Sequence, residues 1–218
     1  ANISVVAVSL KNDPTFFNRP RTIQLTGTLP PVGEDLTING PGANLLTIAG
    51  DNQSRVLIIS SSIAALNLSG VTITGGNAGA EAGGGILNNG GLEIIGCHIT
   101  GNTAAFGGGI SDGNSASELF IQLSTISNNI ATGSSTGGGI SSLPSVTIIN
   151  STISGNTVTG SNGGNGGGLS LASGEIENCT IANNSASGAN SAGGLQVNAL
   201  TVTLGNTIIA GNVNNGAV

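Results

Sequence analysis

The chain has 218 residues, of which 38 are glycine and only four are phenylalanine, while methionine, tryptophan and tyrosine are absent. Its mean hydropathy is nevertheless positive, at +0.28, which excludes a disordered glycine-rich linker and predicts a narrow aliphatic core. Only four residues are basic, all of them before residue 56, against ten acidic ones; this balance excludes a nucleic-acid partner and disfavours an anionic membrane surface.

The first element in chain order is a predicted N-terminal cap over residues 1–20. This segment contains Lys11, Pro14, Phe16, Phe17, Arg19 and Pro20. A cap is expected because a solenoid must cover the open backbone groups of its first coil. Residues 21–218 are then predicted to form the solenoid itself, so that the whole chain is one domain.

A short phrase built around Thr-Ile recurs through residues 21–218 and marks the repeat. It reads CHITGN at 97–102, STISNN at 124–129, STISGN at 151–156 and CTIANN at 179–184. Upstream copies contain Ile23 and Ile48, and later ones give a predicted core stack of isoleucines at a nearly constant interval: Ile73, Ile99, Ile126, Ile153, Ile181 and Ile208. Self-similarity at a fixed period is the signature of a repeat architecture.

Two further phrases lie between successive isoleucine marks. One is a glycine cluster closed by an aliphatic residue, such as GGGI at 83–86, 107–110 and 137–140, and the other is a short apolar strand such as LEII at 92–95 or VTII at 146–149. With no helical stretch between the strands, βαβ units are excluded. The sequence therefore predicts an all-β fold: a single-stranded, right-handed parallel β-helix of about eight coils of 25–28 residues, with three short strands per coil.

An asparagine follows each marked isoleucine by three positions in four consecutive copies: Asn102, Asn129, Asn156 and Asn184. Stacked one coil apart, these side chains could form an inward hydrogen-bonded ladder that satisfies buried turn carbonyls. The alternative is a series of exposed turn asparagines. The strict spacing beside variable neighbours favours the ladder.

These phrases resemble the right-handed β-helix repeats of secreted bacterial proteins, in particular the GGA[ILV] and FxxN repeats of polymorphic outer-membrane proteins. GGGI stands for the first motif and Ile99-Thr-Gly-Asn102 for the second, with isoleucine in place of the usual phenylalanine. The stretch at 29–59 and NTIIAGN at 206–212 also look like extracellular proteins of the choice-of-anchor type. The resemblance covers most of the chain, and it implies the fold and secretion rather than an activity.

No metal or other cofactor is predicted. Cys97 and Cys179 occupy one repeat position three coils apart, about 14 Å, which is too far for a disulfide, so both are expected to be small packing residues. GGNGGGLSL at 163–171 has the glycines of a calcium-binding nonapeptide repeat but not its aspartate. Asp51 and Asp112 stand alone, so a turn is preferred to a calcium site.

Glu175 and Glu177 are the only candidates for a catalytic pair. Their i, i+2 spacing places both carboxyl groups on one face of a strand, about 7 Å apart, within the range that glycosidases use. The preceding coil has Thr147 and Ile149 at the equivalent positions, so it adds no further carboxylate, and no aromatic platform for a sugar is predicted beside the pair. The alternative, a solvated acidic spot, is therefore favoured.

The residues that flank the marked isoleucines point outward and form a candidate binding face rich in threonine: Thr72, Thr74, Thr100, Thr125, Thr152 and Thr180. Stacked Thr-x-Thr arrays are typical of solenoids that bind ice. The alternative is that threonine is simply favoured on strands and in cross-strand pairs.

The expected function is that of a non-catalytic, extracellular or cell-surface structural or adhesive module. Its expected partners are further copies joined through coil ends and a cell-surface or extracellular glycan. No membrane span is expected, because no run of 18 apolar residues occurs. The alternatives are a carbohydrate-active β-helix enzyme or glycan-binding module, and an ice-binding solenoid.

Overall fold

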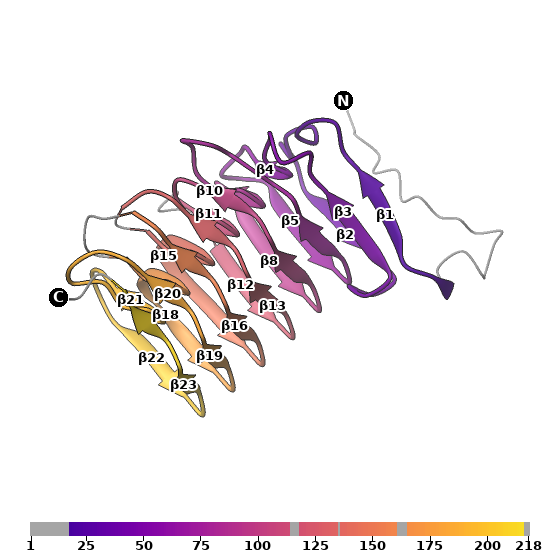
Figure 1. Ribbon diagram of the computed structural model, residues 1–218. Coiled ribbons are helices and arrows are strands. Elements are labelled where there is room, and N and C mark those ends of the chain that lie inside the picture. The colour runs from indigo at the N-terminus through magenta and orange to yellow at the C-terminus, as the bar shows by residue number, and fades with distance from the viewer. Residues whose placement is uncertain (1–17, 114–117, 135, 161–164, 216–218) are drawn as a thin grey trace.

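The computed structural model describes residues 18–113, 118–134, 136–160 and 165–215. The chain winds as a parallel β-helix, whose coils stack in sequence order from β1 at one end to β23 at the other (Figure 1). This confirms the predicted fold. Residues 1–17 of the predicted cap lie outside the described residues.

Sheet A is formed by the strands that carry the isoleucine marks. Neighbouring strands pair in parallel and in register, with Ile73 opposite Ile99 and Ile126 opposite Ile153. Eight strands require seven full turns of the chain: β1 (Arg21–Gln24), β3 (Leu46–Ala49), β6 (Thr72–Thr74), β9 (His98–Thr100), β13 (Thr125–Ser127), β16 (Thr152–Ser154), β19 (Thr180–Ala182) and β23 (Ile208–Ala210).

Sheet B contains both of the other predicted strand series. The first series follows the glycine clusters and comprises β4 (Leu57–Ile59), β7 (Ile86–Asn88), β11 (Ile110–Asp112) and β21 (Leu195–Val197). The second comprises β2 (Leu36–Asn39), β5 (Ala65–Ser69), β8 (Gly91–Ile95), β12 (Glu118–Gln122) and β22 (Val202–Gly205). In two coils one long strand serves both series: β15 (Ile140–Ile149) and β18 (Leu169–Glu177).

Sheet C is a strand position that the sequence did not predict. It consists of two-residue strands directly after the ladder asparagines: β10 (Thr103–Ala104), β14 (Ile130–Ala131), β17 (Thr157–Val158), β20 (Ser185–Ala186) and β24 (Val213–Asn214). Two residues are too few to show an alternating pattern. The buried residues of three of these strands, Ala131, Val158 and Ala186, form a small second core.

The main core is a column of aliphatic side chains inside the tube. Ile73, Ile99, Ile126, Ile153 and Ile181 are fully buried, and they pack with inward residues of sheet B such as Ile94 and Ile148. Alternation along each strand produces this arrangement, because successive side chains point to opposite faces. Within the described part of the chain, no helix is long and apolar enough to cross a membrane.

The last member of the predicted core stack requires a correction. In the final described coil Ile209, not Ile208, pairs with Ile181, and Ile208 pairs with the outward-facing Thr180. The Ile208 side chain is accordingly 63% exposed. Adjacent isoleucines in NTIIAGN allow both alignments, but the cross-strand register admits only one.

Candidate functional site

The predicted asparagines form a continuous hydrogen-bonded ladder inside the tube. Asn102 donates from Nδ2 to Oδ1 of Asn129 at 3.0 Å, and the same bond joins Asn129 to Asn156 and Asn156 to Asn184. A further step, missed from the sequence, joins Asn184 to Asn212 at 2.9 Å. From Asn129 onward, each side chain also accepts the backbone N–H of the preceding ladder asparagine, for example Asn102 N to Asn129 Oδ1 at 3.1 Å.

The glycine clusters make room for this ladder. A Cβ placed on Gly109 would lie 2.9 Å from the Asn129 amide nitrogen, and one on Gly139 would lie 3.0 Å from the Asn156 side chain. The asparagine phrase and the glycine cluster therefore form one packing unit inside the tube. This unit is structural, since Asn102, Asn129, Asn156 and Asn184 are fully buried.

A second ladder runs through the position that both cysteines occupy. The backbone N–H of Cys97 donates to Ser124 Oγ at 3.1 Å, that of Ser124 to Ser151 Oγ at 3.1 Å, and that of Ser151 to Cys179 Sγ at 3.4 Å. Thr207 continues the series. Both cysteines are free and buried. A thiol here replaces a hydroxyl as a hydrogen-bonding link, beyond the packing role expected from sequence.

The cysteine thiols should be poorly reactive in the folded protein. Burial raises the pKa of both Cys97 and Cys179, which depletes the reactive thiolate. Alkylation by iodoacetamide at pH 8 should be slower than in the guanidinium-unfolded chain by on the order of a hundredfold, as followed by mass spectrometry. Because the folded-state pKa is raised, the stabilisation from keeping these thiols neutral is complete below the unfolded pKa and is lost as the pH rises through the folded one. Equal labelling rates in both states would contradict the ladder.

The outward face of sheet A places the predicted threonines in two columns. The first contains Thr47, Thr72, His98, Thr125, Thr152 and Thr180, and the second contains Ala49, Thr74, Thr100, Ser127, Ser154 and Ala182. All of these side chains are partly buried except the exposed His98. Some hydroxyls are fixed: Thr72 donates to the Ala43 carbonyl oxygen at 2.7 Å, and Ser127 donates to Thr100 Oγ1 at 3.2 Å.

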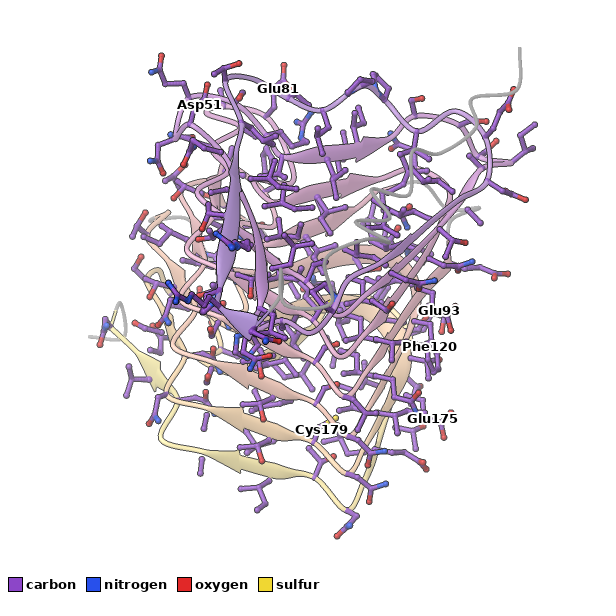
Figure 2. All side chains as sticks on the ribbon, turned by 90° about the vertical axis from the view of Figure 1, so that its right-hand side faces the viewer. Asp51, Glu81, Glu93, Phe120, Glu175 and Cys179 are labelled. Carbon is purple, nitrogen blue, oxygen red and sulfur yellow. The ribbon has the colours of Figure 1, made fainter. Side chains whose placement is uncertain are left out.

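The outward face of sheet B carries the predicted acidic pair and an aromatic residue that the sequence did not place beside it. Phe120 pairs with Glu93 on one side and Thr147 on the other, and Thr147 pairs with Glu175. Figure 2 shows Glu93, Phe120 and Glu175 following one another along this side of the molecule. Glu177, which follows Glu175 on the same strand, lies in the neighbouring column with Ile149. Strand pairing thus places Phe120 in the same column as Glu175, two strands away, which sequence spacing alone did not show.

The carboxylates of Asp112 and Asp51 have structural partners. Asp112 is fully buried and accepts hydrogen bonds from Asn88 Nδ2 and Ser142 Oγ, both at 2.9 Å. Asp51 accepts the backbone N–H groups of Gln53 and Ser54 in a tight turn, and these bonds lower its pKa. Among the described residues, no group of three or more His, Cys, Asp or Glu side chains could hold a metal ion.

Comparisons of the chain with protein-family models, with curated proteins and with solved structures find no match. The resemblance to secreted β-helix repeats therefore remains a prediction from the sequence.

Proposed function

We propose that this protein is a non-catalytic, extracellular adhesive module: a stiff rod that presents the hydroxyl face of sheet A to an ordered, uncharged glycan. The observation that carries the proposal is the pair of aligned columns on sheet A, which run through strands β3 to β19 without a charged residue. Parallel pairing repeats each column position about every 4.8 Å, so the face offers a regular row of donors and acceptors.

The chemistry of this face favours a neutral ligand. Hydroxyl groups donate and accept hydrogen bonds, and they lose little solvation energy compared with charged groups when a surface covers them. Because the threonine and serine side chains are partly buried and some are already hydrogen-bonded, little side-chain entropy is lost on binding. Many weak contacts in a row then add up through multivalency.

The proposal is tested by co-sedimentation with insoluble neutral polysaccharides such as cellulose, xylan and chitin. Replacing Thr125 and Thr152 by tyrosine should lower the partition constant on the bound polysaccharide about tenfold, because two bulky rings lift the ligand from the flat face, a loss of about 1.4 kcal/mol. Thr37→Tyr is the matched control, since Thr37 is exposed on sheet B. Equal loss in the control, or no binding by the wild-type protein, would reject the proposal.

Ice binding is the second candidate, and the same two columns favour it because they are flat, uncharged and regularly spaced. Thermal hysteresis that disappears in Thr125→Tyr but not in Thr37→Tyr would assign the face to ice. Release of reducing sugar that is abolished by Glu175→Gln or Glu177→Gln would assign the protein instead to the carbohydrate-active enzymes.

A further inference from the structure

Leu123 has a backbone conformation that leucine rarely adopts. It lies at the turn from sheet B to sheet A, where the equivalent residues of five other coils, Gly70, Gly96, Asn150, Asn178 and Asn206, all have positive φ. The φ of Leu123 is 52°, in the left-handed region that is costly for a residue with a branched apolar side chain.

Burial of the Leu123 side chain does little to offset this cost, because the residue is 61% exposed. Glycine or asparagine would fit this turn better and would leave less apolar surface in water. A strained residue with an exposed apolar side chain is an outlier that points to a role outside folding.

Other apolar side chains lie on the outward face of sheet B, on β12, which ends just before Leu123, and on the two strands that pair with it. Phe120 lies on the same strand, β12, while Ile95 and Ile149 lie on the adjacent strands and both pair with Gln122, which precedes Leu123. Phe120, Ile95 and Ile149 are only partly buried. Leu123, Phe120, Ile95 and Ile149 are hereafter called the apolar patch.

Carboxylates surround the apolar patch. Glu93 pairs with Phe120 across the strands, Glu118 precedes Phe120 on the same face of β12, and Glu177 pairs with Ile149. Glu175 lies in the same column as Phe120, two strands away, as Figure 2 shows. The sequence has no Lys or Arg after Arg55, so the strands that carry these carboxylates hold no basic residue.

We propose that this patch is a docking surface for an extended cationic peptide segment that carries an apolar side chain between two basic ones. Charge complementarity selects the basic residues, since carboxylates around an apolar centre attract cations and repel acidic partners. An anionic membrane surface would be repelled by the same carboxylates. The aliphatic members of the patch favour an apolar side chain of a protein over a sugar ring.

The distance between Glu93 and Glu175 determines how the basic and apolar residues of the peptide must be spaced. Glu93 and Glu175 belong to one column and are separated by three strand steps, about 14 Å. An extended peptide advances about 3.4 Å per residue, so four residues span this distance, and residues 1, 3 and 5 point to the same side. The motif is therefore basic–x–apolar–x–basic, with the peptide lying along the rod axis and its apolar side chain near Phe120.

The test uses a labelled nine-residue peptide with lysine at its third and seventh positions, phenylalanine at its fifth and serine elsewhere, measured by fluorescence anisotropy. Glu93→Gln and Glu175→Gln should each weaken binding about threefold and together about tenfold, and added salt should weaken it further. Glu34→Gln removes the same charge from an exposed position elsewhere, and it should leave the affinity unchanged.

Leu123→Asn separates binding from folding. Asparagine accepts positive φ, so this variant should melt several degrees higher than the wild type while it binds the peptide about fivefold more weakly. If Leu123 had only a structural role, its replacement would not raise the melting temperature and weaken peptide binding at the same time.

Three outcomes would overturn the proposal. The first is no binding of the peptide at millimolar concentration. The second is a loss of peptide affinity in Glu34→Gln as large as that in Glu93→Gln or Glu175→Gln, because the effect would then depend only on the net charge of the protein. The third is concentration-dependent self-association that Leu123→Asn abolishes, which would assign the patch to a second copy of the chain. None of these results depends on the sheet A face, so failure here is distinct from failure of the proposed adhesive function.

Discussion

Replacing Gly138 by alanine should destabilise the protein by more than about 4 kcal/mol or prevent folding altogether. A Cβ at this position would lie 2.2 Å from the carbonyl oxygen of Gly167 and 2.8 Å from the backbone nitrogen and oxygen of Thr157. All three are backbone atoms, one in the glycine turn of the next coil and two in β17, so no side chain can rotate away. The coils cannot move apart either, because the three sheets hold them at the spacing of a parallel ladder, about 4.8 Å.

Urea denaturation followed by circular dichroism measures this loss. Gly113→Ala is the matched control: a Cβ there meets no atom within 4 Å, and its stability should stay within about 0.5 kcal/mol of the wild type. Similar midpoints for Gly138→Ala and Gly113→Ala would show that the coils are more loosely stacked than described.

The second large effect is expected for Asn129→Ala, which should cost about 3–5 kcal/mol. Asn129 Nδ2 donates to the carbonyl oxygen of Ile99 at 2.9 Å, and its Oδ1 accepts the N–H of Asn102 at 3.1 Å. Truncation removes both partners from groups that lie inside the tube, where each unpaired polar group costs about 1–3 kcal/mol. A cavity beside Gly109 adds to the loss.

Asn67→Ala provides the comparison, because Asn67 is exposed on β5 and its replacement should be nearly neutral. Equilibrium unfolding in urea should therefore separate the two variants clearly. An equal loss of unfolding free energy in both variants, or no loss in either, would mean that the amide ladder contributes nothing specific to stability.

The sequence predicted the stacked isoleucines and the ladder because both depend on one near-constant period. Ile99, Ile126 and Ile153 recur at equal intervals, and in a parallel solenoid an equal period places residues directly over one another. The prediction went wrong at 206–212, where Ile208 and Ile209 fit the spacing equally well. That one-residue shift also hid Asn212 as a member of the ladder.

Sheet B was harder to align from sequence, because the interval between its equivalent strands varies from coil to coil. The step from Ile86 to Ile110 is shorter than the step from Ile110 to Ile140, although both pairs lie in register. β15 also has an irregular register between Ser142 and Ser145 that no periodic phrase indicates. The apolar patch and its carboxylates therefore became neighbours only through strand pairing.

The ladder at the cysteine position was only partly visible in the sequence. Cys97 and Cys179 were recognised as members of one column with Ser124 and Ser151, because they hold the same place in the repeated phrase. Hydroxyl and thiol groups look unrelated in a sequence, however, so the hydrogen bonds that join them from coil to coil were missed.

The ladders have a consequence for how such a molecule can change length. In the asparagine ladder each Nδ2 group donates to Oδ1 of the asparagine in the next coil. The same hydrogen bond therefore joins each pair of adjacent coils in the ladder. Gain or loss of one whole repeat by gene duplication or excision would thus leave every junction chemically intact and alter the reach of the protein by about 4.8 Å per turn. Evolution can tune how far such a protein extends without redesigning either of its faces.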